Sequence, residues 1–126
     1  MKPSSMPPEN NVGLARVWRA FFYSRDGFIA AYKNEAAFRQ EVWLALVLIP
    51  LSLFLPVSVL GKALMIASVL LVLIVELLNS AIEAIVDLAS PGQHELAKRA
   101  KDMGSAAVLI SLVNVGCVWL GVWLTK

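Results

Sequence analysis

Three long stretches with almost no charge constrain this sequence more than any other feature. No charged residue occurs from 42 to 61 or from 103 to 125, and the stretch from 63 to 86 holds only Glu76 and Glu83. A helix that crosses a bilayer needs about 20 predominantly apolar residues. The chain has 126 residues, 59% hydrophobic and 16% charged, which does not fit a soluble domain or a disordered protein. We therefore predict an all-α membrane protein with three spans, at about 42–61, 63–86 and 103–125.

The residues before the first span divide into two parts. Residues 1–11 combine three prolines with Ser and Asn and show no apolar periodicity, so we expect a disordered tail before a single membrane domain at 12–126. Residues from about 12 to 41 interleave aromatic and basic side chains, which is typical of an amphipathic helix on the membrane surface. We expect Gly27 to mark a break within this segment.

The distribution of Lys and Arg residues predicts how the chain is oriented in the membrane. Six Lys and Arg residues precede the first span and three lie between the second and third, whereas the other two connections hold only Lys62 and Lys126. The positive-inside rule therefore places the N-terminus and the second loop in the cytoplasm. The net charge of +2 is too small to indicate nucleic acid as a partner. The single Cys117 excludes an intrachain disulfide and a site with several cysteine ligands.

The second predicted span carries the candidate chemistry. Glu76, Asn79, Glu83 and Asp87 are spaced three, four and four residues apart, which places them on one stripe of a helix. A carboxylate at the bilayer centre costs about 2.5–3.5 kcal/mol on insertion scales, and such residues usually mark function. Asn79 alone is better explained as a residue that hydrogen-bonds neighbouring helices together. Two glutamates on the same stripe favour a functional site.

The depths of these side chains suggest different roles. Near the surface, Glu83 and Asp87 offer the oxygen ligands that hold Mg²⁺ together with nucleotide phosphates. About two turns deeper, Glu76 is removed from water and is a plausible general base for a lipid hydroxyl. Across the loop, Lys101 and Ser105 share one helix face, where a lysine could neutralise phosphate charge or simply anchor the helix at the membrane surface.

Three blocks of this sequence closely resemble the small bacterial integral-membrane diacylglycerol kinases. They are residues 34–41 (NEAAFRQE), 75–84 (VELLNSAIEA) and 100–110 (AKDMGSAAVLI), and they follow in the order and spacing of that family. The resemblance implies a homotrimer of three-span subunits whose active sites are shared between neighbours. It also implies ATP- and Mg²⁺-dependent phosphorylation of diacylglycerol to phosphatidic acid at the cytoplasmic face of the inner membrane. We expect direct in-line transfer to the lipid hydroxyl.

The resemblance also implies roles for individual residues. Glu76 would be the general base with Asn79 beside it, and Glu35 and Glu83 would hold the metal that bridges the phosphates of ATP. The residues expected to contact the nucleotide are Lys101, Asp102, Arg16, Tyr23 and His94, together with the metal-binding Glu35 and Glu83. The residues expected to face the lipid are Arg16, Glu76 and Ser105.

Two other functions stay open at this stage. The related undecaprenol kinases would share the fold, metal site and base but accept a polyprenol; the start of the third span, residues 103–106 (MGSA), looks more like the diacylglycerol enzymes. A small proton-coupled transporter subunit would use Glu76 and Glu83 as a proton relay. That interpretation gives no reason for Glu35, Lys101 and Asp102 to gather at the cytoplasmic face.

Overall fold

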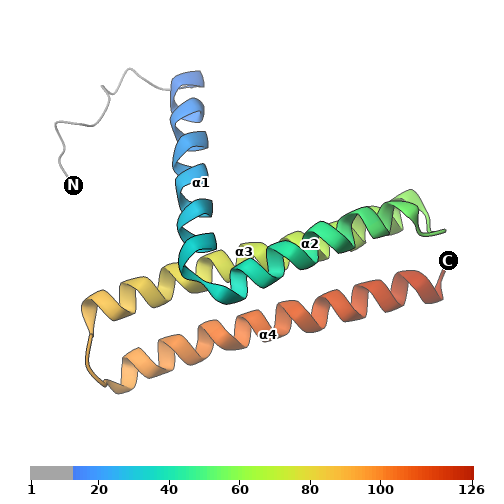
Figure 1. The fold of residues 1–126 in the computed structure, drawn as a ribbon. Coiled ribbons are helices and arrows are strands. Elements are labelled where there is room, and N and C mark those ends of the chain that lie inside the picture. Colours follow the sequence, from blue (N-terminus) through green and yellow to red (C-terminus); the bar gives the residue numbers. More distant parts are fainter. Residues whose placement is uncertain (1–12) are drawn as a thin grey trace.

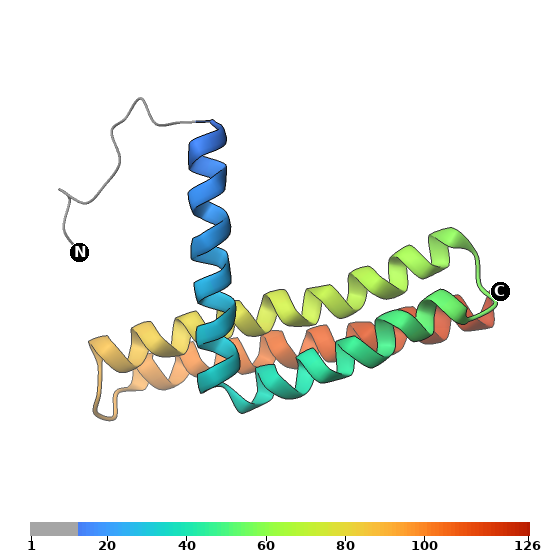
Figure 2. The same cartoon turned by 45° about the horizontal axis from the view of Figure 1, so that its top comes forward.

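The computed structural model describes residues 13–126, and the regular structure in that range is entirely helical. Four helices follow one another: α1 (Leu14–Asn34), α2 (Ala36–Phe54), α3 (Val59–Ala89) and α4 (Glu95–Leu124). Helices α2, α3 and α4 lie side by side with alternating direction, and α1 runs across their axes (Figures 1 and 2). The tail expected at residues 1–11 lies outside the described residues.

Three helices are long and apolar enough to cross a membrane, which confirms the predicted number of spans. At 1.5 Å per residue, the 19 residues of α2 measure about 28 Å, close to the roughly 30 Å hydrocarbon core. The 31 residues of α3 measure about 46 Å. Because α3 and α4 run on past the α1–α2 junction, their surplus length lies at the end of the bundle that carries the α3–α4 loop (Figure 1).

The helices differ in extent from the apolar stretches of the sequence. Helix α2 begins at Ala36 rather than near residue 42, and α4 begins at Glu95 rather than near residue 103. In both cases the added turns contain charged side chains. Helix ends are set by backbone hydrogen bonding and need not coincide with the ends of an uncharged stretch.

The turn between α2 and α3 ends the first span earlier than residue 61. Leu55 is held in an extended conformation before Pro56, as the proline ring requires of the residue that precedes it. The side chain of Lys62 donates to the carbonyl oxygens of Ser52, Leu53 and Leu55 at 3.3, 3.0 and 2.7 Å. These bonds satisfy the free carbonyl groups at the C-terminus of α2.

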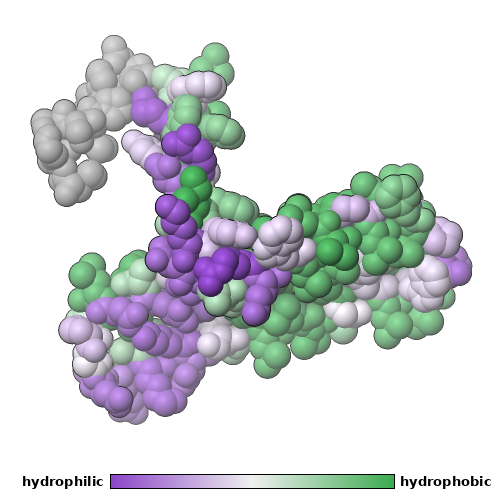
Figure 3. Space-filling view, in the orientation of Figure 1, coloured by the Kyte–Doolittle hydropathy of each residue, from purple (hydrophilic) through white to green (hydrophobic). Residues whose placement is uncertain are grey.

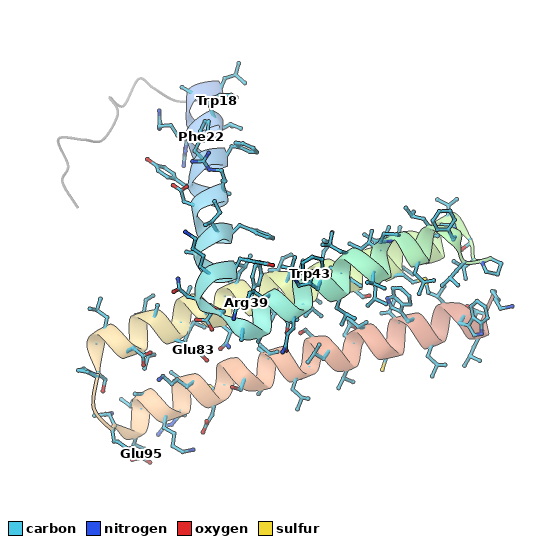
Figure 4. The ribbon with its side chains drawn as sticks, in the orientation of Figure 1. Trp18, Phe22, Arg39, Trp43, Glu83 and Glu95 are labelled. Carbon is cyan, nitrogen blue, oxygen red and sulfur yellow. The ribbon has the colours of Figure 1, made fainter. Side chains whose placement is uncertain are left out.

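A sharp bend at Glu35 separates α1 from α2. Glu35 has extended backbone angles, φ −119° and ψ 109°, whereas α1 is continuous through Gly27, so the break expected at that glycine is absent. A single glycine costs a helix only about 1 kcal/mol. At the bend, Arg39 donates to the carbonyl oxygens of Tyr32 and Lys33 at 2.8 and 3.1 Å (Figure 4). This arginine of α2 therefore caps the last turn of α1.

Aromatic contacts hold the same bend. The rings of Phe28 and Phe38 meet edge to face, 5.0 Å between centroids, and Phe38 is fully buried. The indole nitrogen of Trp43 donates to the hydroxyl of Tyr32 at 3.1 Å. The last turns of α1 are thus packed on α2, while the far half of α1 projects away from the bundle and exposes its aromatic side chains, Trp18 among them (Figure 4).

Helices α3 and α4 pack along most of their length. The indole nitrogen of Trp119 donates to the carbonyl oxygen of Met65 at 3.3 Å and to the hydroxyl of Ser68 at 3.2 Å. At the sequence level Trp119 is typical of an aromatic belt at the membrane interface. In the structure it cross-links α3 and α4, and Trp123 is the more exposed of the two.

We predict that Arg39→Ala loosens the bend between α1 and α2. The substitution removes two charge-assisted hydrogen bonds at the end of α1, each worth about 1–3 kcal/mol when partly buried. We expect amide hydrogen exchange in residues 28–36 of the detergent-solubilised protein to rise by about tenfold. Arg25→Ala is the matched control, because Arg25 pairs with Asp26 and Phe22 inside α1. Equal exchange in both variants would show that Arg39 does not hold the bend.

Candidate active site

Polar side chains gather at one end of the molecule. Figure 3 shows hydrophilic residues along α1, at the α1–α2 junction and at the end of the α3–α4 hairpin, while hydrophobic residues cover most of the rest of the bundle. The residues of the predicted polar stripe lie in the half of α3 that reaches this end. This end of the molecule therefore offers the polar surface that a charged ligand needs.

A cluster of carboxyl groups lies where α2, α3 and the helix junction meet. Glu76 on α3 is only 4% exposed and Asn79, one turn along, is 8% exposed. Asn79 and Glu41 of α2 lie close to the carboxyl group of Glu76. Glu35 at the junction and Glu83 on α3 are close enough to act electrostatically on Glu76. Three predicted site residues and one further glutamate are thus held around the candidate base.

Asn79 is fixed between a carboxylate and the backbone of α4. Its amide nitrogen donates to Glu83 at 3.3 Å. Its amide oxygen is buried against Gly104 and has no hydrogen-bond partner among the described residues. A Cβ atom at position 104 would overlap that oxygen. Gly104 therefore permits the close approach of α4 that holds Asn79, and through it Glu83, in place.

A mostly apolar pocket of about 650 Å³ lies between the inner half of α1 and α3. Its walls include Phe28, Leu77 and small residues of both helices, and Glu35 and Ser80 line it too. The hydroxyl oxygen of Ser80 is buried and has no hydrogen-bond partner among the described residues. Apolar walls with a carboxyl and a hydroxyl group suit an amphiphilic ligand.

A second and more polar pocket, of about 770 Å³, lies at the end of the α3–α4 hairpin. The predicted nucleotide-contacting residues His94, Lys101 and Asp102 all line it. The ammonium group of Lys101 contacts the carboxylate of Asp87 at 2.6 Å, and Lys98 contacts Asp102 at 2.7 Å. Lys101 is also close enough to Glu83 to interact with it electrostatically. This lysine therefore links the pocket to the carboxyl cluster.

His94 has a local structural role that sequence reasoning left undefined. It is the N-cap of α4, and its Nδ1 accepts a hydrogen bond from the backbone N–H of Leu96 at 3.1 Å. Such a cap satisfies one of the free N–H groups of the first turn. His94 thus fixes the point at which the loop becomes a helix beside Lys98 and Lys101.

Within one chain, three predicted site residues lie apart from the carboxyl cluster and from the two pockets. Arg16 lies nineteen residues before Glu35 on α1, about 28 Å along the helix. Tyr23 is exposed on the same helix, and Ser105 is exposed on α4 next to the buried Gly104. In addition, no group of three His, Cys, Asp or Glu side chains within residues 13–126 could hold a metal ion by itself.

Sequence reasoning missed Glu41 and Gly104 as members of the site. Glu41 is the last charged residue before a long apolar stretch, and that pattern is equally typical of a residue that merely marks the membrane boundary. Gly104 follows Lys101 by three residues, so a helical register places both on neighbouring parts of one face. Only the structure shows that this glycine meets Asn79.

The fold and the two pockets define a membrane-embedded protein with an acidic site at one end of a helical bundle. Comparison with known proteins gives the family. The family model for prokaryotic diacylglycerol kinase matches residues 22–123. This chain belongs to the prokaryotic diacylglycerol kinase family and is a kinase, which confirms the predicted resemblance.

Relatives named diacylglycerol kinase are similar over nearly the whole chain. The protein from Pseudomonas aeruginosa is 54% identical over 119 residues, which cover 94% of this chain and 95% of the relative. The protein from Haemophilus influenzae is 51% identical, covering 87% and 93%. The protein from Escherichia coli K12 is 49% identical, covering 87% and 90%. Family membership favours the kinase interpretation of the polar stripe over the proton-relay interpretation.

We predict that Gly104→Ala lowers catalytic efficiency by at least about tenfold. The added methyl group must push Asn79 from its position, and misplacement of a site residue by about 1 Å can cost about a hundredfold in rate. The measurement is kcat/KM for lipid phosphorylation in mixed micelles. Gly116→Ala is the matched control, since a Cβ atom there meets nothing within 4 Å. Equal activity of the two variants would show that this close approach does not matter for catalysis.

Proposed function

We propose that this protein transfers the γ-phosphoryl group of ATP to diacylglycerol, forming phosphatidic acid for phospholipid metabolism. The observation that carries the proposal is the buried Glu76, which lies among other carboxyl groups about three helical turns from a lysine-bearing pocket, in a chain of this family. The two pockets match the two substrates. An apolar pocket with polar groups suits the lipid, and a polar pocket with lysines suits a polyphosphate.

The reaction needs one proton acceptor next to the lipid. A carboxylate oxygen of Glu76 accepts the proton of the free hydroxyl of diacylglycerol. The resulting oxygen attacks the γ-phosphorus in line, and the bond between that phosphorus and the bridging oxygen of ADP breaks. The proton stays on Glu76 until it is released to water. No side chain of the protein is phosphorylated in this scheme.

Glu35 and Glu83 would hold a Mg²⁺ ion, and the donor set fits that ion. Mg²⁺ is usually bound through one or two carboxylates together with substrate phosphates and water, so two glutamates suffice without a third protein ligand. When bound, the ion neutralises charge on the phosphates. Asn79 orients Glu83 by donating its amide N–H to that carboxylate. The bend at Glu35 places the other carboxyl group on the edge of α1 that faces α3.

Lys101 and Asp102 would contact the nucleotide, with His94 at the edge of their pocket. Lys101 is engaged by Asp87, and both side chains are substantially exposed. Ion pairs in such positions contribute little to stability. A phosphate group can therefore replace Asp87 beside Lys101 at small cost. The same reasoning applies to the exposed pair of Lys98 and Asp102.

We propose further that the protein is a homotrimer with active sites shared between subunits. The support is that Arg16, Tyr23 and Ser105 are assigned to the site by resemblance but lie apart from it within one chain. A neighbouring subunit would bring them to it. We also propose that α1 lies in the cytoplasmic interface of the bacterial inner membrane. The basic residues before α2 and between α3 and α4 favour that orientation.

We predict that the purified protein in mixed micelles transfers label from γ-labelled ATP to dioleoylglycerol in the presence of Mg²⁺. Glu76→Gln should lower kcat by about a hundredfold or more, because a positioned base contributes 10²–10⁴-fold. Glu83→Gln should raise the Mg²⁺ concentration needed for half-maximal rate. The measurement is labelled phosphatidic acid separated from ATP by thin-layer chromatography.

Three outcomes would contradict parts of this proposal. Label that enters undecaprenol but not dioleoylglycerol would identify a polyprenol kinase. Full activity of Glu76→Gln would remove the assigned base. Label trapped covalently on the protein would replace direct transfer by a two-step mechanism.

We predict that Lys101→Gln raises the KM for ATP by about tenfold and changes the KM for diacylglycerol little, because the substitution removes a phosphate-facing charge. Arg99→Gln is the matched control, since Arg99 is an exposed cation two residues earlier on α4. Steady-state kinetics with both substrates varied gives the comparison. Equal KM values for ATP in the two variants would move the nucleotide away from Lys101.

A further inference from the structure

Asn114 lies at the middle of the apolar part of α4. The charge-free stretch covers residues 103–125, so eleven residues, or about 16 Å of helix, separate Asn114 from either end. Its side chain is half-buried and makes no hydrogen bond to any of the described residues. A side-chain amide has two N–H donors and an acceptor oxygen, and the hydrocarbon of a bilayer offers no partner to either. The amide of Asn114 therefore needs a partner that one chain does not supply.

Three serines in the apolar parts of the helices find their partners inside the chain. The hydroxyl groups of Ser52, Ser68 and Ser111 each donate at 2.7 Å to the backbone carbonyl oxygen three residues earlier. Ser111 precedes Asn114 by three residues on α4, so a polar side chain in this part of the helix can be satisfied without another chain. The unpaired amide of Asn114 is therefore the feature that needs an explanation.

Asn114 belongs to a stripe along the open side of α4. Among the described helices, only α3 packs against α4. Residues spaced alternately three and four apart share one face of α4, and all of them except the half-buried Asn114 are exposed: Ala107, Ile110, Asn114, Cys117, Gly121 and Leu124. This spacing is typical of helices that pack side by side, and small residues in it allow close approach in membranes. In such a seam a single polar Asn specifies the register and the number of helices.

We propose that this Asn114 stripe packs against a second copy of the chain, with the amide of Asn114 hydrogen-bonded across the interface. The inference rests on the proposed homotrimer and names a surface by which its subunits meet. A second copy is favoured over another partner because it enters the membrane in the same orientation. Its own Asn114 lies at the same depth, and an amide is complementary to an identical amide, since each offers donors and an acceptor.

An asparagine that faced only lipid would respond to substitution in the opposite direction. In that case valine at this position would remove an unsatisfied amide and leave any assembly of the chain as strong as before or stronger. If the amide is bonded to a neighbouring subunit, the same replacement removes a bond between subunits and loosens the assembly. The sign of the effect therefore separates the two interpretations.

The test measures how fast subunits exchange between oligomers of the full-length protein in detergent micelles. Affinity-tagged and untagged protein are mixed, and the untagged chain recovered with the tagged one is followed over time. We expect Asn114→Val to raise the exchange rate by about tenfold or more. Asn114→Gln keeps an amide and should stay within about threefold of the wild-type rate. Ser111→Ala is the matched control and should exchange like the wild type, because the hydroxyl group it removes bonds within its own helix.

The outcomes separate this inference from the proposals beneath it. A wild-type protein whose mass by light scattering is that of a monomer overturns the homotrimer and this interface with it. An oligomeric wild type that exchanges at the same rate as Asn114→Val overturns the interface alone. Equally fast exchange in Ser111→Ala and Asn114→Val would indicate a general loosening of α4 and also overturn it. Circular dichroism verifies the helix content of Asn114→Val, and Asn114→Leu gives the same comparison if the valine variant loses helix.

Discussion

One constraint dominates the structure. Helix α3 carries carboxyl groups to a place that water does not reach, so neighbouring side chains must surround them. Helix α3 places Glu76 in an almost fully buried position, and lipid offers such a group neither hydrogen bonds nor counter-charge. The partners come from the helices packed on either side. Glu41 of α2 and Asn79 of α3 lie close to Glu76, and Gly104 lets α4 close over Asn79.

Much of the fold was predictable because hydrophobicity and charge act locally. The three charge-poor stretches gave the number of spanning helices, and a period of 3.6 residues put Glu76, Asn79 and Glu83 on one face of α3. The bend at Glu35 was not predictable in the same way. It depends on Arg39 reaching back to the last carbonyl groups of α1, which is a contact between two helices.

The sequence predicted which site residues share a face of one helix. It did not predict which residues of different helices face one another. Resemblance to a known family supplied Glu35, which composition would have left as an ordinary surface acid. Glu41 and Gly104 escaped because their roles arise where α2 and α4 meet α3, and no periodic pattern specifies which residues oppose one another there. All the site roles stay predictions, and Arg16, Tyr23 and Ser105 are the assigned residues that one chain alone does not bring to the cluster.

The unequal lengths of the helices have a consequence for how the two reactants meet. Helix α2 is about as long as the hydrocarbon core is thick, whereas α3 is about 18 Å longer, so the α3–α4 hairpin rises above the plane in which α2 begins. In the proposed reaction, a water-soluble nucleotide can bind at the top of this hairpin without entering the bilayer. A lipid can arrive by lateral diffusion in the leaflet and never has to leave it. Catalysis would then join a three-dimensional search by one substrate with a two-dimensional search by the other.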